Sequence, residues 1–273
     1  MDTLISSEKE MHTRYLSGEV KQQLLLDFKK ANRRLIFLDY DGTLVPYVKY
    51  PHQAKPGEKL LATLKHLSDV SNTEVVIISG RDKAILQEWL GSLDIELAAE
   101  HGAWRKEKHR DWQLSALFVN DWKPEIRSVL QQYVNRLPGA FIEEKDFSLV
   151  WHYRAADEKS CAMIKNDFLN MMRKYVDDMN IEILQGNTVI EVRTTGVNKG
   201  TAGKYWIEKR RSDFILAIGD DRTDEDLFLA LPQTAYTIKV GTPPSFARYN
   251  LLDNQQPVVI ELLEDLVKNE YTT

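Results

Sequence analysis

The chain has 273 residues, of which 43% are hydrophobic and 28% are charged, a composition typical of a globular protein. Its formal net charge of −5 argues against nucleic acid as the main partner, because phosphate backbones select basic surfaces. A single cysteine excludes an intramolecular disulfide, and every apolar run falls far short of the ~20 residues of a membrane span. We therefore expect a cytoplasmic protein with neither nucleic acid nor a membrane as its partner.

The first third of the chain indicates alternating helices and strands. A polar helical lead is expected over residues 1–33, followed by a strand over the apolar run 35–38. The next expected elements are a helix after Gly57, a strand at 74–79, a helix at 82–91 and a strand at 95–100. This order is typical of a parallel sheet covered by helices.

The middle of the chain has a different pattern, with hairpins grouped around two helices. The helices are expected at 124–137 and 157–176, and the strands at 141–144, 148–153, 181–184 and 189–193. After Gly196 the first pattern returns, with helices at 199–208, from 223 and at 260–267, and strands at 214–218 and 236–240. We therefore predict an α/β core from residues 1–105 and 195–273, interrupted by an α+β domain over 106–194.

The segment Asp39-Tyr40-Asp41-Gly42-Thr43-Leu44 directly follows the first predicted strand. Carboxylates at the carboxyl end of a parallel strand face the crevice where open α/β sheets bind ligands. Two carboxylates two residues apart can divide the work, one as nucleophile or metal ligand and the other in proton transfer. An Asp-Gly turn with a capping aspartate is the alternative for this segment taken alone.

Three further segments lie at strand ends or helix starts. Ser79-Gly80-Arg81 offers a hydroxyl and helix-start amides to an oxyanion, although a tight turn before an N-cap is the better explanation of this segment taken alone. Lys199 stands at a helix start, where a cation is unfavourable without an anionic partner, although an ordinary exposed lysine is the commoner explanation of one such position. The acidic stretch 219–225 carries the hard oxygen ligands that suit Mg²⁺, and an acidic first helical turn is its alternative reading.

In order and spacing these four segments resemble the motifs of the haloacid dehalogenase-like phosphohydrolase superfamily. The resemblance narrows to the trehalose-6-phosphate phosphatase family, on the strings at 38–44, 79–81, 99–102, 150–154, 197–200 and 219–225. It implies a Rossmann-like parallel-sheet core with an inserted α+β cap domain. It also implies a Mg²⁺-dependent phosphatase that hydrolyses trehalose 6-phosphate to trehalose and phosphate, the final step of trehalose biosynthesis, through an aspartyl-phosphate.

The resemblance assigns catalytic roles. Asp39 attacks the phosphorus, while Asp41 protonates the departing oxygen and later deprotonates the hydrolytic water. Asp41 must therefore start protonated, which neighbouring negative charge favours. Ser79 and Lys199 hold phosphoryl oxygens, with help from backbone amides of the turn at Gly42.

The metal is also assigned by resemblance. Mg²⁺ is expected to bind Asp39, the backbone carbonyl of Asp41 and Asp220, which thereby joins the catalytic residues. Asp221 or Asp224 is expected to orient its waters.

The implied substrate-binding residues lie in the core loops and in the predicted cap. They are Gly42, Gly80, Arg81, Glu100, His101, Gly102, His152, Arg154, Asn187 and Glu191. Strand alternation places His152 and Arg154 on the sheet face opposite the cap helices. The family often has a lysine four residues before the glutamate of the last cap strand, where this chain has Asn187, so another sugar preference stays open.

Two alternatives to this function remain. One is a phosphatase of another sugar phosphate, such as sucrose 6-phosphate. The other is a non-catalytic regulatory domain that binds a sugar phosphate, whose mark would be the loss of Asp39, Asp41 or Asp220. The lead segment is similar to the stretch that joins the two parts of two-part trehalose enzymes, which implies a trehalose-6-phosphate synthase domain or subunit as a partner.

Overall fold

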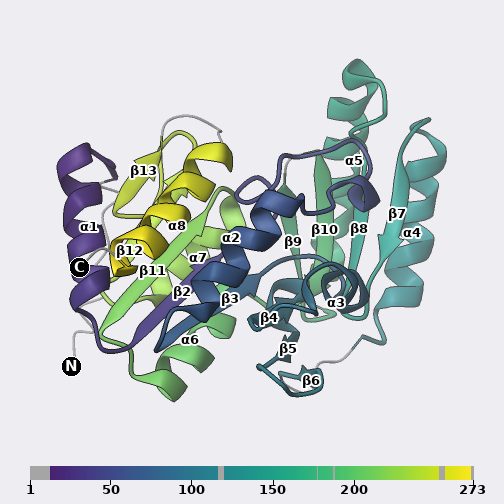
Figure 1. Cartoon of the computed structure of the whole chain (residues 1–273). Coiled ribbons are helices and arrows are strands. Elements are labelled where there is room, and N and C mark those ends of the chain that lie inside the picture. The colour runs from purple at the N-terminus through teal and green to yellow at the C-terminus, as the bar shows by residue number, and fades with distance from the viewer. Residues whose placement is uncertain (1–12, 116–119, 177, 187, 252–255, 272–273) are drawn as a thin grey trace, which may run out of the picture.

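The computed structural model describes residues 13–115, 120–176, 178–186, 188–251 and 256–271, and it contains two β-sheets (Figure 1). The larger sheet has the strand order β1-β13-β12-β11-β2-β3-β4-β5-β6. Its strands are β1 (Arg14–Tyr15), β2 (Arg34–Leu38), β3 (Thr73–Ile78), β4 (Glu96–Ala99), β5 (Trp104–Lys106), β6 (Gln113–Leu114), β11 (Phe214–Gly219), β12 (Tyr236–Val240) and β13 (Tyr249–Leu251). All neighbours from β1 to β4 are parallel, and β5 and β6 extend the sheet antiparallel.

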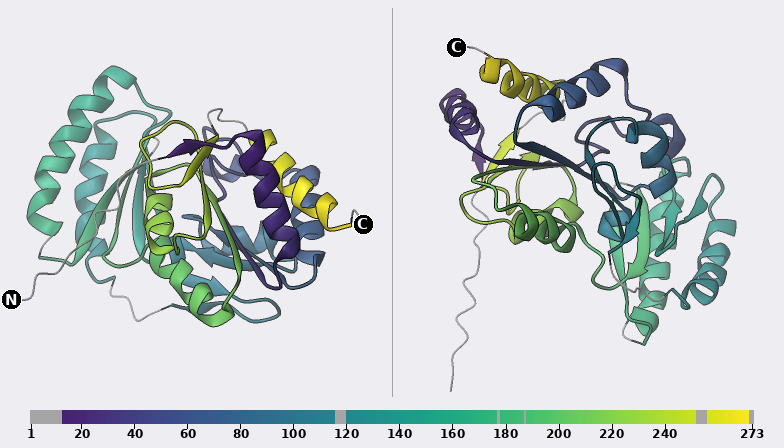
Figure 2. Two further views of the ribbon diagram at one scale, coloured as in Figure 1. Left: turned by 90° about the vertical axis from the view of Figure 1, so that its left-hand side faces the viewer. Right: turned by 60° about the horizontal axis from the view of Figure 1, so that its bottom comes forward.

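Helices cover both faces of the larger sheet (Figure 2). One face packs on α1 (Gly18–Lys30), α2 (Glu58–Asp69), α3 (Lys83–Leu90) and α8 (Gln256–Tyr271), and the other on α6 (Lys199–Arg210) and α7 (Arg222–Ala230). Strand β2 shows why both faces must be covered: Ile36 and Leu38 join the first cluster of buried side chains, and Leu35 and Phe37 join the second. The α/β fold class predicted from the sequence is confirmed.

The smaller sheet is antiparallel, with the order β7-β8-β10-β9. Its strands are β7 (Phe141–Glu144), β8 (Ser148–His152), β9 (Ile181–Gly186) and β10 (Val189–Thr194). Helices α4 (Lys123–Asn135) and α5 (Glu158–Val176) pack on one face, around a cluster that includes Trp151, Phe168 and Ile190. The opposite face, which carries Val150 and His152, turns toward the larger sheet.

Side-chain caps begin the helices that follow the functional strands. The Asp82 carboxylate accepts a hydrogen bond from the Ala84 amide at 2.6 Å, and Asn198 accepts one from the Thr201 amide at 2.8 Å. Asp221 forms a capping box with Asp224 at the start of α7. These caps fix the sharp turns that bring Ser79, Lys199 and Asp220 to one edge of the sheet.

Several short elements were not predicted from the sequence. Strands β1, β5, β6 and β13 have two or three residues each, too few for a hydrophobic period to show. Helix α8 begins at Gln256, earlier than expected. Helix α1 covers 18–30 of the predicted lead, whose residues 1–12 lie outside the described ranges. The larger sheet reaches Leu114, and the residue bounds of the two domains stay a prediction. Within the described ranges, no helix combines the length and apolar character needed to cross a membrane.

Candidate active site

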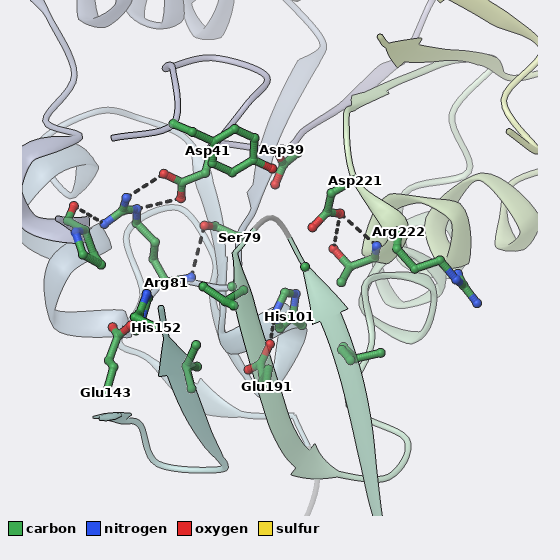
Figure 3. Close-up of a pocket in the computed structure, with 18 of the residues that line it drawn as sticks. Asp39, Asp41, Ser79, Arg81, His101, Glu143, His152, Glu191, Asp221 and Arg222 are labelled. Atoms are coloured by element: carbon green, nitrogen blue, oxygen red, sulfur yellow. Dashed lines mark hydrogen bonds and ion pairs between the residues drawn. The ribbon is translucent and has the colours of Figure 1, made fainter. Parts of the chain in front are cut away.

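A pocket opens between the carboxyl ends of the core strands and the free face of the smaller sheet (Figure 3). From the core it is lined by Asp39, Asp41, Tyr47, Val48, Lys49, Pro51, Ser79, Gly80, Arg81, His101, Lys199, Asp221, Arg222 and Thr223. From the smaller sheet and its loops it is lined by Glu143, Lys145, Val150, His152, Arg154, Leu184, Gln185, Gly186, Val189 and Glu191. We call it the central pocket.

A buried lysine holds two aspartates at the floor of the pocket. Lys199 Nζ donates to Asp39 Oδ1 at 2.6 Å and to Asp224 Oδ1 at 2.8 Å, and all three side chains are buried. Burial lowers the pKa of Lys199, but the charges of Asp224 and Asp39 outweigh it and hold that pKa well above its usual value. Lys199 lies at a helix start, where the helix dipole disfavours a cation. Asp39 and Asp224 are the anionic partners that this position predicted.

Asp39, Asp220 and Asp224 form a carboxylate cluster, with one oxygen of each within 4.8 Å of the others. Burial raises the pKa of Asp39 well above its ordinary value, and Asp220 and Asp221 add to this while Lys199 opposes it. Burial and the charges of Asp221 and Asp224 raise the pKa of Asp220 to about 7. In the described part of the chain Asp39 Oδ2 is buried and has no hydrogen-bond partner. Crowded hard oxygens with one orphaned atom fit a small divalent cation such as Mg²⁺.

Gly42 makes the close approach of Asp220 feasible. Its φ is +89°, a region that favours glycine, and a Cβ there would lie 2.2 Å from Asp220 Oδ2. Among the described residues Gly42 is not part of the pocket lining, so its place in the structure is to admit the Asp220 carboxylate.

Asp221 is occupied as a helix cap. Its Oδ1 accepts from the Thr223 amide at 2.8 Å and from Thr223 Oγ1 at 2.6 Å. Burial raises its pKa, but the Lys199 charge and the Thr223 hydrogen bonds outweigh this and hold the pKa well below the usual range. Asp221 therefore lies beside the carboxylate cluster and is not one of its three members.

Asp41 faces Arg81 in a two-pronged ion pair (Figure 3). Arg81 Nε donates to Asp41 Oδ2 at 2.7 Å and Arg81 Nη2 to Oδ1 at 2.6 Å. The guanidinium also donates to the Pro51 carbonyl at 2.7 Å and lies over the Trp89 ring. Neighbouring negative charge was expected around Asp41, whereas its nearest charged partner in the structure is the Arg81 cation. Ser79, which lines the pocket nearby, accepts a hydrogen bond from the Arg81 amide at 3.2 Å.

A hydrogen bond between His101 and Glu191 joins the core to the smaller sheet. His101 Nε2 lies 2.9 Å from Glu191 Oε2, and both side chains are buried (Figure 3). Burial lowers the pKa of His101, with Glu191 opposing it, while burial raises the pKa of Glu191 and the nearby His101 and Lys145 outweigh that and lower it. Gly80 leaves the space, because a Cβ there would lie 2.6 Å from His101 Nε2.

Charged side chains of the smaller sheet form the opposite wall. His152 Nε2 lies 2.7 Å from Glu143 Oε2, and Lys145 Nζ donates to the Gly80 carbonyl at 2.9 Å. Burial raises the pKa of Glu143, but Lys145 and His152 more than offset this and lower it to about 2. Leu149 and Trp151 of β8 pack on the helices, while Val150, His152 and Arg154 line the pocket, so the predicted alternation is confirmed.

Glu100 lies at the contact between the two sheets. Its carboxylate accepts from the backbone amides of Asp146 at 3.2 Å and Phe147 at 2.9 Å, in the turn between β7 and β8. Neither Glu100 nor Gly102 is among the described residues that line the central pocket. Gly102 packs against Ala202. The substrate roles assigned to Glu100 and Gly102 stay predictions, and Asn187 lies outside the described residues.

The sequence model of the family named trehalose-phosphatase matches residues 37–255, which include all of the motifs above. The chain belongs to the trehalose-phosphatase family. A bifunctional trehalose-6-phosphate synthase/phosphatase of Thermoproteus tenax is 38% identical over 246 residues, which cover 90% of this chain and 34% of that protein. The curated relatives are longer proteins, and the chain spans about a third of their length.

Solved structures show the same trehalose-phosphatase fold. The C-terminal domain of a C. albicans trehalose-6-phosphate phosphatase superposes with a TM-score of 0.87 at 31% identity, covering 95% of this chain and 99% of that chain. A haloacid dehalogenase-like hydrolase of Bacteroides thetaiotaomicron has a TM-score of 0.61 at 14% identity, with 85% of this chain and 99% of that chain covered. The second likeness shows the fold alone.

Tyr47, Glu143 and Lys145 are among the pocket residues of this trehalose-phosphatase family member that were not predicted from the sequence. Glu143 and Lys145 were assigned to a strand and a turn, although their spacing of two places them on one face, and register pairs Glu143 with Val150 of that face. Strand alternation applied to β7 could therefore have found both. Tyr47 follows the first motif in a segment without period, and no sequence signal points to it.

Proposed function

We propose that the chain hydrolyses trehalose 6-phosphate to trehalose and phosphate, the final step of trehalose biosynthesis, with Mg²⁺ as cofactor. Family membership and the names of the relatives support the substrate. The observation that carries the chemistry is Asp39, at the floor of the central pocket: one carboxylate oxygen is bound by Lys199, and the other is buried with no hydrogen-bond partner among the described residues. That is the environment of a nucleophile paired with an anion-binding cation.

Asp39 acts as the nucleophile. A carboxylate oxygen of Asp39 forms a bond to phosphorus while the bond between phosphorus and the sugar oxygen breaks, and water later cleaves the acyl phosphate to regenerate Asp39. Lys199 and Ser79 hold the phosphoryl oxygens, and the buried ammonium offsets the charge that develops on them.

Asp41 moves the proton. It protonates the departing sugar oxygen and then accepts a proton from the hydrolytic water. Both of its oxygens accept from Arg81 in this structure, so the ion pair must separate first. A substrate that draws the Arg81 guanidinium toward its own oxygens would release Asp41 at the moment it is needed.

The carboxylate cluster fits a metal. Asp39, Asp220 and the backbone carbonyl of Asp41 would hold Mg²⁺, with Asp224 and Asp221 behind them. When bound, the ion lowers the repulsion between the carboxylates and an anionic phosphate.

The sugar would be read by the side chains that face Asp39 across the pocket. Acceptors and donors alternate there, from Glu143, Lys145, His152, Arg154 and Glu191, which suits the hydroxyls of a disaccharide. The insert that carries them would act as a cap, and its contacts at Glu100 and His101 would exclude water from the phosphorylated aspartate.

The partner we propose is a trehalose-6-phosphate synthase domain or subunit. The Thermoproteus tenax relative is named as a bifunctional synthase/phosphatase, and this chain covers only its matching third. A cytoplasmic location stays a prediction from composition.

A phosphate-release panel tests the proposal. Trehalose 6-phosphate, sucrose 6-phosphate, glucose 6-phosphate and an aryl phosphate are each incubated with Mg²⁺, with EDTA and with the Asp39→Asn variant. Asp69→Asn is the matched control, because that carboxylate is exposed and pairs only with Lys65 among the described residues. Preference for trehalose 6-phosphate that EDTA and Asp39→Asn both abolish supports the function. Preference for another sugar phosphate would keep the mechanism and replace the substrate, and binding without turnover would favour a regulatory domain.

A further inference from the structure

Tyr47 lies between the carboxylate cluster and the smaller sheet. Its hydroxyl donates to Asp220 Oδ2 at 2.9 Å, and its ring centroid lies 5.4 Å from the guanidinium carbon of Arg154. Tyr47 comes from the loop that follows the first motif, and Arg154 follows strand β8. One side chain therefore contacts both the metal-site candidate and the sugar-facing wall.

The hydroxyl determines how Asp220 sits. Apart from Tyr47, the hydrogen bond that reaches this carboxylate from a described side chain is the longer one from Thr43 Oγ1, at 3.3 Å. Asp224 accepts from the amides of Asp220 and Asp221 but gives the Asp220 carboxylate no donor. The hydrogen bond from the Tyr47 hydroxyl is therefore the shorter of the two side-chain hydrogen bonds that restrain the Asp220 carboxylate. Other carboxylates crowd this group.

The ring determines what supports Arg154. A guanidinium within about 6 Å of an aromatic centroid is attracted to its face. Arg154 lies two residues beyond the end of β8 at His152, and the aromatic platform beneath its guanidinium limits the positions that the side chain samples.

We propose that Tyr47 is a positioning residue with two separable parts, a hydroxyl that orients Asp220 for the metal and a ring that orients Arg154 for the sugar. The inference rests on the proposed function, since it names how that site is assembled. It assigns the metal effect to the hydroxyl oxygen and the sugar effect to the aromatic ring, and the hydroxyl can be removed either alone or together with the ring.

Tyr47→Phe and Tyr47→Leu separate the two parts. Tyr47→Phe removes the hydroxyl and keeps the ring, so Mg²⁺ and Mn²⁺ should bind about three- to tenfold more weakly, the usual size for a single intramolecular hydrogen bond. The KM for trehalose 6-phosphate at saturating Mg²⁺ should stay at its wild-type value. Tyr47→Leu removes both parts, so it should show the same metal defect and also raise KM about two- to fivefold.

The matched control is Tyr50→Phe, the same chemical change three positions along the same loop. Tyr50 is 37% exposed and is not among the described residues of the pocket lining, so metal affinity and KM should both stay unchanged. Metal affinity is measured by calorimetry on the whole chain without substrate and by the electron paramagnetic resonance signal of free Mn²⁺, which are independent of turnover. Thermal unfolding checks that every variant is folded.

The ring is tested against Arg154 directly. The ratio of KM between Tyr47→Leu and Tyr47→Phe should be about two to five in the normal background and about one when Arg154→Gln is also present. Equal ratios in the two backgrounds would refute the ring's part. Unchanged or tighter metal binding by Tyr47→Phe would refute the hydroxyl's part, because a phenol that merely competes with the ion predicts tightening. A wild-type chain that neither binds Mg²⁺ nor releases phosphate would refute the proposed function itself, a result distinct from both.

Discussion

Replacing Gly42 by alanine tests the geometry of the carboxylate cluster most sharply. The backbone of Gly42 has φ +89°, and a β-carbon would lie 2.2 Å from Asp220 Oδ2 and 2.4 Å from its Cγ. Ordinary contacts begin about 1 Å further away. The Asp220 carboxylate must therefore turn out of the cluster, which breaks its bond from Tyr47.

The expected magnitudes differ for stability and for function. Holding alanine at this φ costs about 1–3 kcal/mol of unfolding free energy, which lowers the melting temperature of a chain of this size by roughly 2–10 °C. Turning Asp220 away also relieves the burial and the charge crowding that together raise its pKa to about 7, so this movement adds little to the loss of stability. Metal affinity and turnover carry the main effect, and we expect each to fall by more than about tenfold.

The assay combines thermal unfolding, Mg²⁺ calorimetry and phosphate release. Gly18→Ala is the matched control, because a β-carbon there would meet nothing within 4 Å. It should leave activity unchanged and stabilise helix α1 slightly. A Gly42→Ala variant with normal metal affinity and turnover would refute the close packing of Gly42 on Asp220.

Three further changes have defined outcomes. Asp39→Asn should abolish phosphate release yet keep trehalose 6-phosphate binding, measured by calorimetry; retained turnover would exclude Asp39 as the nucleophile. Glu143→Gln should flatten the acid dependence of stability, because a pKa held at about 2 in the folded chain supplies stability above the unfolded value of 4.5 that is lost as pH falls toward 2; urea unfolding between pH 5 and 2 measures it, and an unchanged slope would contradict it. Glu100→Ala should lower the free energy of unfolding by about 2–4 kcal/mol, because a buried amide and a partly buried amide of the β7–β8 turn lose their acceptor; a rise in KM without loss of stability would instead support the sugar-reading role expected from sequence.

The sequence was sufficient for the long elements and for the order of the motifs. The apolar run at 35–38 was predicted to be a buried strand, and the helix expected to begin near Asp82 starts there, with Asp82 as its N-cap. The caps at Asn198 and Asp221 were not predicted, although the helices that they begin were expected from 199 and 223. Strands such as β1 and β5 could not be predicted, since their two or three residues take their conformation from a neighbouring strand.

The candidate site was predictable where a residue acts through its own loop. Asp39 and Lys199 were placed by motifs alone, and the structure joins them. The pairing of Asp41 with Arg81 depends on a contact between separate loops, so local sequence gave no hint of it. Glu100 illustrates the same limit, because whether a buried carboxylate meets a ligand or a backbone amide is decided by the turn that packs on it.

The order of strands in the larger sheet affects how this chain can be made. Strand β2, which ends beside Asp39, is flanked by β3 on one side and by β11 on the other, and β11 is formed by Phe214–Gly219. During synthesis the edge of β2 that pairs with β11 therefore remains unpaired until most of the chain has left the ribosome. The hydrogen bond between Asp39 and Lys199 likewise forms late, because Lys199 is 160 positions further along the chain. Fragments that stop before residue 214 will expose this edge, and we expect them to be captured by chaperones or to aggregate rather than fold.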